Sequence, residues 1–216
     1  MNQHLSDPVV SPPLKARCLQ SLSQLFGSVG NNAGRRRLLT HVLKLWRDKG
    51  DDRRVALTLV ELSDVNRLVD LHKEGIQLAK ETLEIFERLG DTAKQAEALI
   101  SLAHVLFDDH QLDAASRAIG LLLEKGEQFQ VCQGRRVLGN ISQSKGDTEK
   151  AIHHYEVALG IASSFNWHDE LFWVHYALSK LSFRQGRFDG VQAHIERGQR
   201  RIPSGSCDGA ASSPLV

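Results

Sequence analysis

The sequence predicts an all-α fold, an α–α superhelix (solenoid) of about five helical hairpins. Three observations indicate this class. One short motif recurs at a nearly constant spacing, apolar residues follow a helical period on both sides of each copy, and no strand-like alternation competes. The chain has 216 residues, of which 41% are hydrophobic and 25% are charged, so it can form both a continuous core and a solvated surface.

The recurring motif is a leucine, a small residue directly after it, and an aliphatic residue two positions beyond the small one. A turn position follows five residues later. The copies begin at Leu22, Leu62, Leu102, Leu138 and Leu178. Their turn positions, 30, 70, 110, 146 and 186, are separated by 40, 40, 36 and 40 residues. Five copies that match at several positions are hard to obtain by chance, so the chain is predicted to be a repeat array.

Each copy resolves into two helices, because apolar residues recur at intervals of three or four before the turn and again after it. Around the third turn these positions are Leu99, Leu102, Val105 and Leu106 before it, and Ala115, Ile119, Leu122 and Leu123 after it. The predicted antiparallel hairpins span residues 14–49, 52–89, 92–125, 128–164 and 168–202. One hairpin cannot bury its apolar face alone, so we expect neighbouring hairpins to stack.

The starts and ends of the helices also carry signals. Asp113, Asp147 and Asp189 stand where second helices begin and can accept backbone N–H bonds there. Thr92 and Gln95 have the spacing of a capping box at the start of the third hairpin. Most second helices repeat a leucine thirteen positions after the turn, at Leu43, Leu83, Leu123 and Leu159. The last copy has Gln199 instead, which suits a solvent-facing end cap.

The two ends of the chain differ from the repeats in composition. Residues 1–13 are rich in proline, serine and polar groups, and residues 203–216 are low in complexity. Both segments are predicted to be disordered. The N-terminus lacks the pattern of a signal peptide, and no apolar run approaches the length of a membrane span. The three cysteines are far apart, which fits a reducing compartment, so we expect a cytoplasmic protein.

The fourth copy, LGNISQSKGDTEKAIHHYEVAL, resembles the tetratricopeptide repeat (TPR). Leu138 and Gly139 match the large and small positions of its first helix, and Ala151, Tyr155 and Ala158 match those of its second. More narrowly, RRLLTHVLKLWRDKGDD, EIFERLGD and VALGIASSFNWHDELFWVHYAL resemble the TPR region of fungal NACHT/NB-ARC-type signal-transduction NTPases. The resemblance covers about residues 14–202 and implies a helical scaffold that binds proteins.

The chain departs from those NTPases in one decisive motif. No GxxxxGK[ST] loop is present, and the segment from Gly30 to Gly34 lacks the lysine and hydroxyl that hold phosphate and magnesium. The nucleotide-switch activity therefore does not carry over.

No catalytic, cofactor or metal site is expected. His153 and His154 are adjacent and point about 100° apart on a helix, while His168 and His175 lack a third ligand on a second helix. No serine stands in a GxSxG elbow, and no cysteine has a histidine close in sequence. Ordinary surface or packing roles are the favoured interpretation, so the protein is predicted not to be an enzyme.

The concave groove of stacked first helices is the predicted binding surface. The candidate partner-binding residues are His104, Arg136, Asn140, Gln143, Trp173, Tyr176, Lys180 and Arg184. The basic residues among them favour an acidic peptide, although ordinary solvated charges are an open alternative. The dense aromatic group between Phe165 and Tyr176 either packs the fourth hairpin on the fifth or anchors a peptide.

Two functional hypotheses remain. The first is a scaffold or adaptor that binds a peptide or helix of another protein in the groove. The second is the truncated sensor arm of a larger STAND-type NTPase. A net charge of +1 gives no reason to expect nucleic acid or membrane as a partner.

Overall fold

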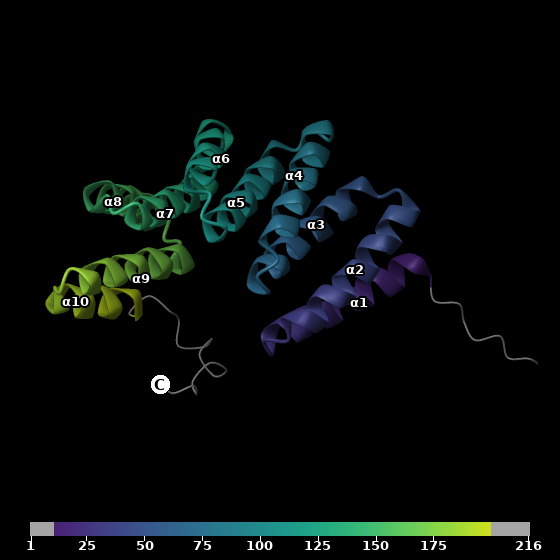
Figure 1. The fold of residues 1–216 in the computed structure, drawn as a ribbon, viewed down its shortest axis with the longest axis horizontal. Helices are drawn as coiled ribbons and strands as arrows, with labels where there is room; N and C mark the ends of the chain where they lie inside the picture. Colours follow the sequence, from purple (N-terminus) through teal and green to yellow (C-terminus); the bar gives the residue numbers. More distant parts are fainter. Residues whose placement is uncertain (1–10, 200–216) are drawn as a thin grey trace, which may run out of the picture. The chain divides into compact units, whose positions relative to one another are not determined.

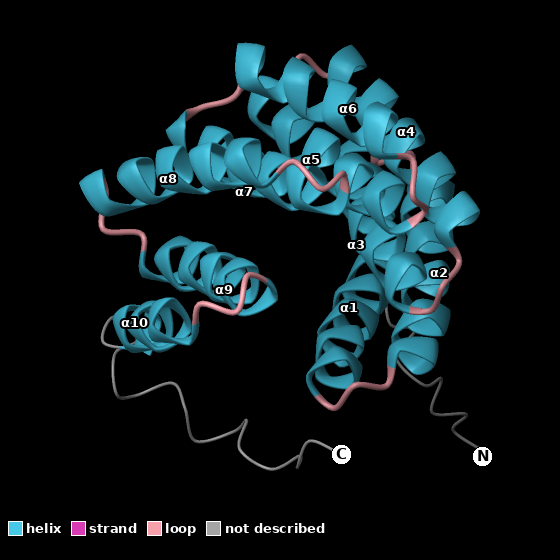
Figure 2. Cartoon of the chain, turned by 60° about the vertical axis from the view of Figure 1, so that its left-hand side comes forward, coloured by secondary structure: helices cyan, strands magenta, loops and turns pink. Residues whose placement is uncertain are grey.

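The computed structural model describes residues 11–199, apart from the side chains of Lys125 and Gln199. Ten α-helices and no strand occur in this part of the chain (Figures 1 and 2). The chain divides into two compact units, and the boundary between Ala118 and Ile119 lies inside a helix.

The first unit contains two complete hairpins, the first helix of the third and the beginning of its second helix. Its helices are α1 (Pro12–Ser28), α2 (Asn32–Lys49), α3 (Asp52–Leu68), α4 (His72–Arg88), α5 (Thr92–Asp108) and the start of α6 (Leu112–Lys125). The second unit takes the rest of α6 and continues with α7 (Gln128–Ser144), α8 (Thr148–Ser164), α9 (His168–Arg184) and α10 (Phe188–Gln199). The predicted all-α array of about five helical hairpins is confirmed.

All five predicted turns adopt the left-handed backbone conformation that reverses the chain between two helices. The φ angles are 74° at Gly30, 60° at Asp70, 59° at His110, 80° at Gly146 and 70° at Gly186. Glycine reaches this region without steric cost, whereas a side chain is strained there. At Asp70 and His110 the fold therefore holds a non-glycine residue in a strained, left-handed backbone conformation.

Directly before each of the helices α3, α5 and α8 stands an aspartate whose carboxylate accepts the backbone N–H three residues further on. These residues are Asp51, Asp91 and Asp147, at distances of 3.1 Å each. The predicted capping box at Thr92 and Gln95 is wrong, because Asp91 is the cap and the buried Gln95 amide donates to the Phe86 carbonyl oxygen at 3.2 Å. Asp113 and Asp189 lie in the first turns of α6 and α10.

Each unit has its own apolar core. In the first unit, Trp46 and Phe86 are buried with Leu39, Val42 and Leu59. In the second, the ring of Tyr155 lies against Gly139 so closely that an added Cβ would stand 2.3 Å from ring carbon Cε1. The small residue of the fourth motif therefore admits the tyrosine of the second helix, as the predicted close approach requires.

The predicted terminal segments largely lie outside the described residues, which exclude 1–10 and 200–216. Helix α1 begins at Pro12, two residues before the predicted start, because proline fits the first helical positions where no N–H bond is needed. Within residues 11–199, no helix combines the length and apolarity that crossing a membrane requires.

Candidate functional site

Four of the predicted binding residues share one exposed face of α9. Trp173 and Tyr176 are 48% and 50% exposed, and Lys180 and Arg184 follow at intervals of four residues. The opposite face of the helix is anchored by buried Val174, Leu178 and Leu181. We call Trp173, Tyr176, Lys180 and Arg184 the α9 surface.

Contacts within the α9 surface give it a defined shape. The rings of Trp173 and Tyr176 meet edge to face, with centroids 6.0 Å apart and an angle of 86°. The Lys180 ammonium nitrogen lies 5.6 Å from the centroid of the Tyr176 ring. Two half-exposed aromatic rings beside two cations provide an apolar contact and a place for an anionic group.

The three candidates on α7 are engaged inside the second unit. The Arg136 side chain is 16% exposed, and its Nε lies 3.1 Å from Oε2 of Glu170, whose side chain is 5% exposed. The hydroxyl of Tyr155 donates to Oδ1 of Asn140 at 2.8 Å and reaches Oε1 of Gln143 at 3.2 Å. Burial raises the pKa of Tyr155, so this hydroxyl keeps its proton. The α7 candidates thus join α7 to α8 and α9, and their part in binding stays a prediction.

His104 is the one candidate that belongs to the first unit. It lies half-buried on α5 in the first unit, whereas the other candidates belong to the second. The sequence also missed Glu170, which accepts from both Arg136 and Gln133. The pairs 133–170 and 136–170 are separated by about one repeat, so a search for charged or amide pairs at that spacing could have found them.

Polar pairs of the same kind join first helices in the first unit. Gln20 on α1 donates to Glu61 on α3 at 2.6 Å, and Arg67 on α3 pairs with Asp108 on α5 at 2.9 Å. Ser101 on α5 donates to Asp64 on α3 at 3.2 Å. Burial raises the pKa of Asp64, and Arg67 and Ser101 oppose that rise. The first helices therefore use many of their polar groups to hold neighbouring hairpins together.

The histidines considered as metal ligands do not converge. His168 is exposed, whereas His175 is buried with its Nδ1 3.3 Å from Nδ1 of His194 on α10. Burial lowers the pKa of His194, and Arg197 and Arg187 lower it further. Among the described residues, no group of three or more potential ligands could hold a metal ion.

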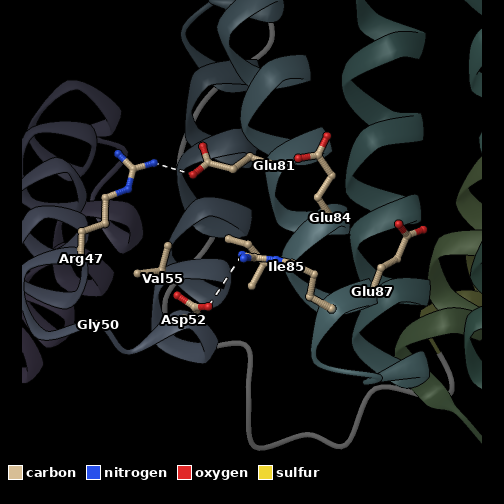
Figure 3. A pocket seen from close by; sticks show the side chains of 9 residues that line it. Arg47, Gly50, Asp52, Val55, Glu81, Glu84, Ile85 and Glu87 are labelled. Atoms are coloured by element: carbon tan, nitrogen blue, oxygen red, sulfur yellow. Dashed lines mark hydrogen bonds and ion pairs between the residues drawn. The ribbon is translucent and has the colours of Figure 1, made fainter.

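The first unit also contains a pocket of about 670 Å³ that the sequence did not predict. It is lined by Arg47, Gly50, Asp52, Val55, Glu81, Glu84, Ile85, Glu87 and Arg88. Figure 3 shows Arg47 reaching Glu81 on α4, with Glu84 and Glu87 further along the same helix. Arg47 of the first hairpin pairs with Glu81 of the second at 2.6 Å, so the pocket lies where these two hairpins meet. Arg88 pairs with Asp52 inside the second hairpin at 3.7 Å.

No protein-family model and no curated protein matches the sequence. Several solved structures are similar to this chain in fold. A Rap protein complexed with competence and sporulation factor superimposes with a TM-score of 0.78 at 15% identity, over 89% of this chain and 55% of that one. The TPR-like repeats of a putative kinesin light chain from Podosopora anserina give 0.65 at 13% identity, over 89% of this chain and 96% of that one. The fold is TPR-like.

A third similar structure is aspartyl phosphate phosphatase F from Bacillus subtilis, with a TM-score of 0.75 at 11% identity, over 88% of this chain and 51% of that one. This TPR-like chain thus spans about half the length of the Rap protein and of the phosphatase. Identities this low show the fold alone. The narrower resemblance to fungal NTPases is not shown by these structures and stays a hypothesis.

Proposed function

We propose that this protein is a non-enzymatic, cytoplasmic interaction scaffold whose α9 surface binds an acidic peptide segment or helix of another protein. The observation that carries the proposal is the exposure of Trp173 and Tyr176 next to Lys180 and Arg184. Aromatic and arginine side chains dominate the binding energy of protein interfaces. A Rap protein of similar fold forms a complex with competence and sporulation factor, which supports a binding role for this chain.

The geometry suggests how such a segment is held. An apolar side chain packs on the perpendicular rings of Trp173 and Tyr176, and a carboxylate accepts charge-assisted hydrogen bonds from Lys180 and Arg184. The buried Arg136–Glu170 pair and the apolar face of α9 fix the helix from behind. A rigid helix loses little freedom on binding, which favours affinity.

The test uses the full chain and a fluorescein-labelled array of acidic ten-residue peptides, each with one aromatic or leucine anchor. We expect binding by anisotropy, and Lys180→Glu with Arg184→Glu should weaken it at least about tenfold. Lys73→Glu is the matched control, because Lys73 is an exposed lysine of the first unit. Equal binding by the Lys180/Arg184 variant and the parent, with unchanged melting, contradicts the proposal.

The sensor-arm alternative rests on the three segments that resemble fungal NTPases. It predicts that the native transcript continues upstream and encodes a phosphate-binding loop. The intact native protein should then be heavier than this chain. Mapping the transcript tests this directly, and it leaves the peptide measurement independent, because a sensor arm can also bind a peptide.

A further inference from the structure

Helix α1 exposes an apolar stripe to solvent. Leu14, Leu22, Leu25 and Val29 are 50%, 40%, 63% and 77% exposed, and exposed Cys18 lies on the same line. Their spacing of four, four and three residues places Leu14, Cys18, Leu22 and Leu25 on one face of the helix, and Val29 follows directly after its last residue. We call these five residues the α1 stripe. A continuous apolar stripe of this length is unusual on a free helix surface.

The repeat register shows that this stripe corresponds to a buried face elsewhere. Five positions before the turn, Leu25 is 63% exposed, whereas its equivalents Val65, Val105, Ile141 and Leu181 are 0%, 0%, 2% and 3% exposed. Eight positions before the turn, Leu22 is 40% exposed, whereas Leu62, Leu102 and Leu178 are 4%, 8% and 7% exposed. At Leu22 and Leu25 the stripe therefore exposes leucines at positions whose equivalents in other copies are buried.

The neighbour that covers this face in other copies is the second helix of the preceding hairpin. A Cβ added to Gly75 on α4 would stand 3.1 Å from the side chain of Val105 on α5. In the second unit, a Cβ added to Gly134 on α7, the equivalent of Cys18, would stand 2.7 Å from Leu122 on α6. The corresponding face of α1 is exposed at Leu22 and Leu25.

Charge indicates which kind of helix fits there. Residues 11–49 contain eight lysines or arginines and one aspartate, whereas residues 51–91 contain ten acidic and six basic residues. The basic first hairpin already pairs with its acidic neighbour through Arg35–Glu61, Arg36–Glu74 and Arg47–Glu81. A second copy docked through α1 would bring two basic hairpins together, which like-charge repulsion disfavours.

We propose that the α1 stripe is a second interaction surface, which docks an acidic amphipathic helix of another protein in the place of a preceding second helix. Apolar residues of that helix cover Leu22, Leu25 and Val29, and its carboxylates face the basic first hairpin. This surface belongs to the first unit and is independent of the α9 surface.

The chain supplies two matched probes, because α2 and α4 both precede a first helix. A labelled peptide of residues 70–90 carries five acidic and three basic residues, and one of residues 30–50 carries one acidic and six basic residues. We expect the full chain to bind the first peptide at least about tenfold more tightly than the second. A version of the first peptide with its four glutamates replaced by glutamine should bind with intermediate affinity.

Leu25→Glu should weaken binding of the acidic peptide at least about tenfold. Leu89→Glu, at a residue 45% exposed elsewhere in the first unit, should leave it unchanged, and so should Tyr176→Ala on the α9 surface. Val29→Glu provides a second stripe variant, since Val29 is 77% exposed and its replacement leaves the core intact.

Three results would overturn the proposal. The first is binding of the acidic peptide that is unchanged in both stripe variants. This result would mean that the peptide replaces α4 of the chain, whose sequence it shares. The second is a dimer in sedimentation that Leu25→Glu converts to monomer, which would make a second copy the occupant. The third is stripe-dependent binding to anionic phosphatidylserine vesicles without peptide binding, which would make the surface a lipid-binding one.

Discussion

The two units of this chain use the same hairpin and both place arginine–carboxylate pairs between neighbouring hairpins, but the exposed fractions of those pairs differ. In the first unit, arginines reach across to carboxylates of the next hairpin, in the pairs Arg35–Glu61, Arg36–Glu74, Arg47–Glu81, Arg53–Asp91 and Arg67–Asp108. In the second, Phe129 on α7 meets Trp167 edge to face at 5.0 Å before α9, and Arg136 pairs with the buried Glu170.

This difference has an energetic consequence. Exposed ion pairs contribute little and weaken in salt, whereas aromatic contacts and a buried pair resist screening. A few small and large residues of the repeat thus determine the fold of each hairpin. The residues that contact the next hairpin can differ from one repeat to another.

The largest effect is expected at the contact of Gly139 with Tyr155. Because an added Cβ already stands 2.3 Å from the ring, Gly139→Leu should lower the free energy of unfolding by about 3 kcal/mol. Gly160, on α8, has no atom near such a Cβ, so Gly160→Ala should raise it by about 1 kcal/mol. Urea unfolding measures both, and hydrogen exchange should place the loss in the second unit. A variant that melts like the parent would mean that the repeat register is wrong.

The next effect contrasts a buried pair with an exposed one. Arg136→Leu leaves the Glu170 carboxylate, only 5% exposed, without its cation and should cost about 2 kcal/mol. Arg47→Leu removes a cation that is 50% exposed and should cost less than about 0.5 kcal/mol. Urea titrations at low and high salt measure the two losses. Equal losses at the two sites would remove the distinction between the units.

The sequence alone predicted the fold well because its signals are local and repeated. All five turn positions were placed from the motif, and Gly139 was correctly assigned a close helix approach. The capping-box spacing predicts the cap at Thr92, whereas in the structure the carboxylate of Asp91, one residue earlier, accepts the backbone N–H of Lys94.

The candidate site was only partly predictable, because solvent exposure depends on partners that the sequence does not name. Trp167 contacts Phe129, whereas Trp173, in the same aromatic group, is 48% exposed. The sequence predicts Arg136 as a binding residue, but in the structure it pairs with Glu170, which lies 34 residues away on another hairpin. Motif positions locate helices, and the pairing between hairpins then decides which charges remain at the surface.

A smaller effect, an increase in stability, is expected when the strained turn residue His110 of the first unit is replaced by glycine. His110 has a φ of 59°, whereas the equivalent turn of the second unit is Gly146 with 80°. His110→Gly should raise the free energy of unfolding by about 0.5–1 kcal/mol, and Gly146→His should lower it by a similar amount. Thermal melts of the two single variants check the pair. If His110→Gly destabilises the protein, the side chain of His110 contributes more than its backbone strain costs.

The smallest effect concerns mild acid and is expected in the second unit. Burial lowers the pKa of both His154 and His194 below the ordinary value of about 6.5, so the unfolded chain binds protons that the folded one does not. Stability is therefore full above that value and falls as the pH drops below it. Asp147, whose pKa is also lowered, keeps its contribution above about pH 4 and does not change in this window.

In the first unit, Asp64 has the opposite effect on the pH dependence of stability. Its carboxyl pKa is raised in the folded state, so the folded chain gains stability relative to the unfolded chain as the pH falls. Hydrogen exchange at pH 7.5 and 5.5, corrected for intrinsic rates, should show faster opening in α8 and α10 than in α3. His194→Gln should remove part of that acid response, while His41→Gln, an exposed residue of α2, should leave it unchanged. The effect is small because His194 is partly exposed and solvent screens the new charge. Faster opening in α3 than in α10 at pH 5.5 would reverse the assignment of the acid-sensitive unit.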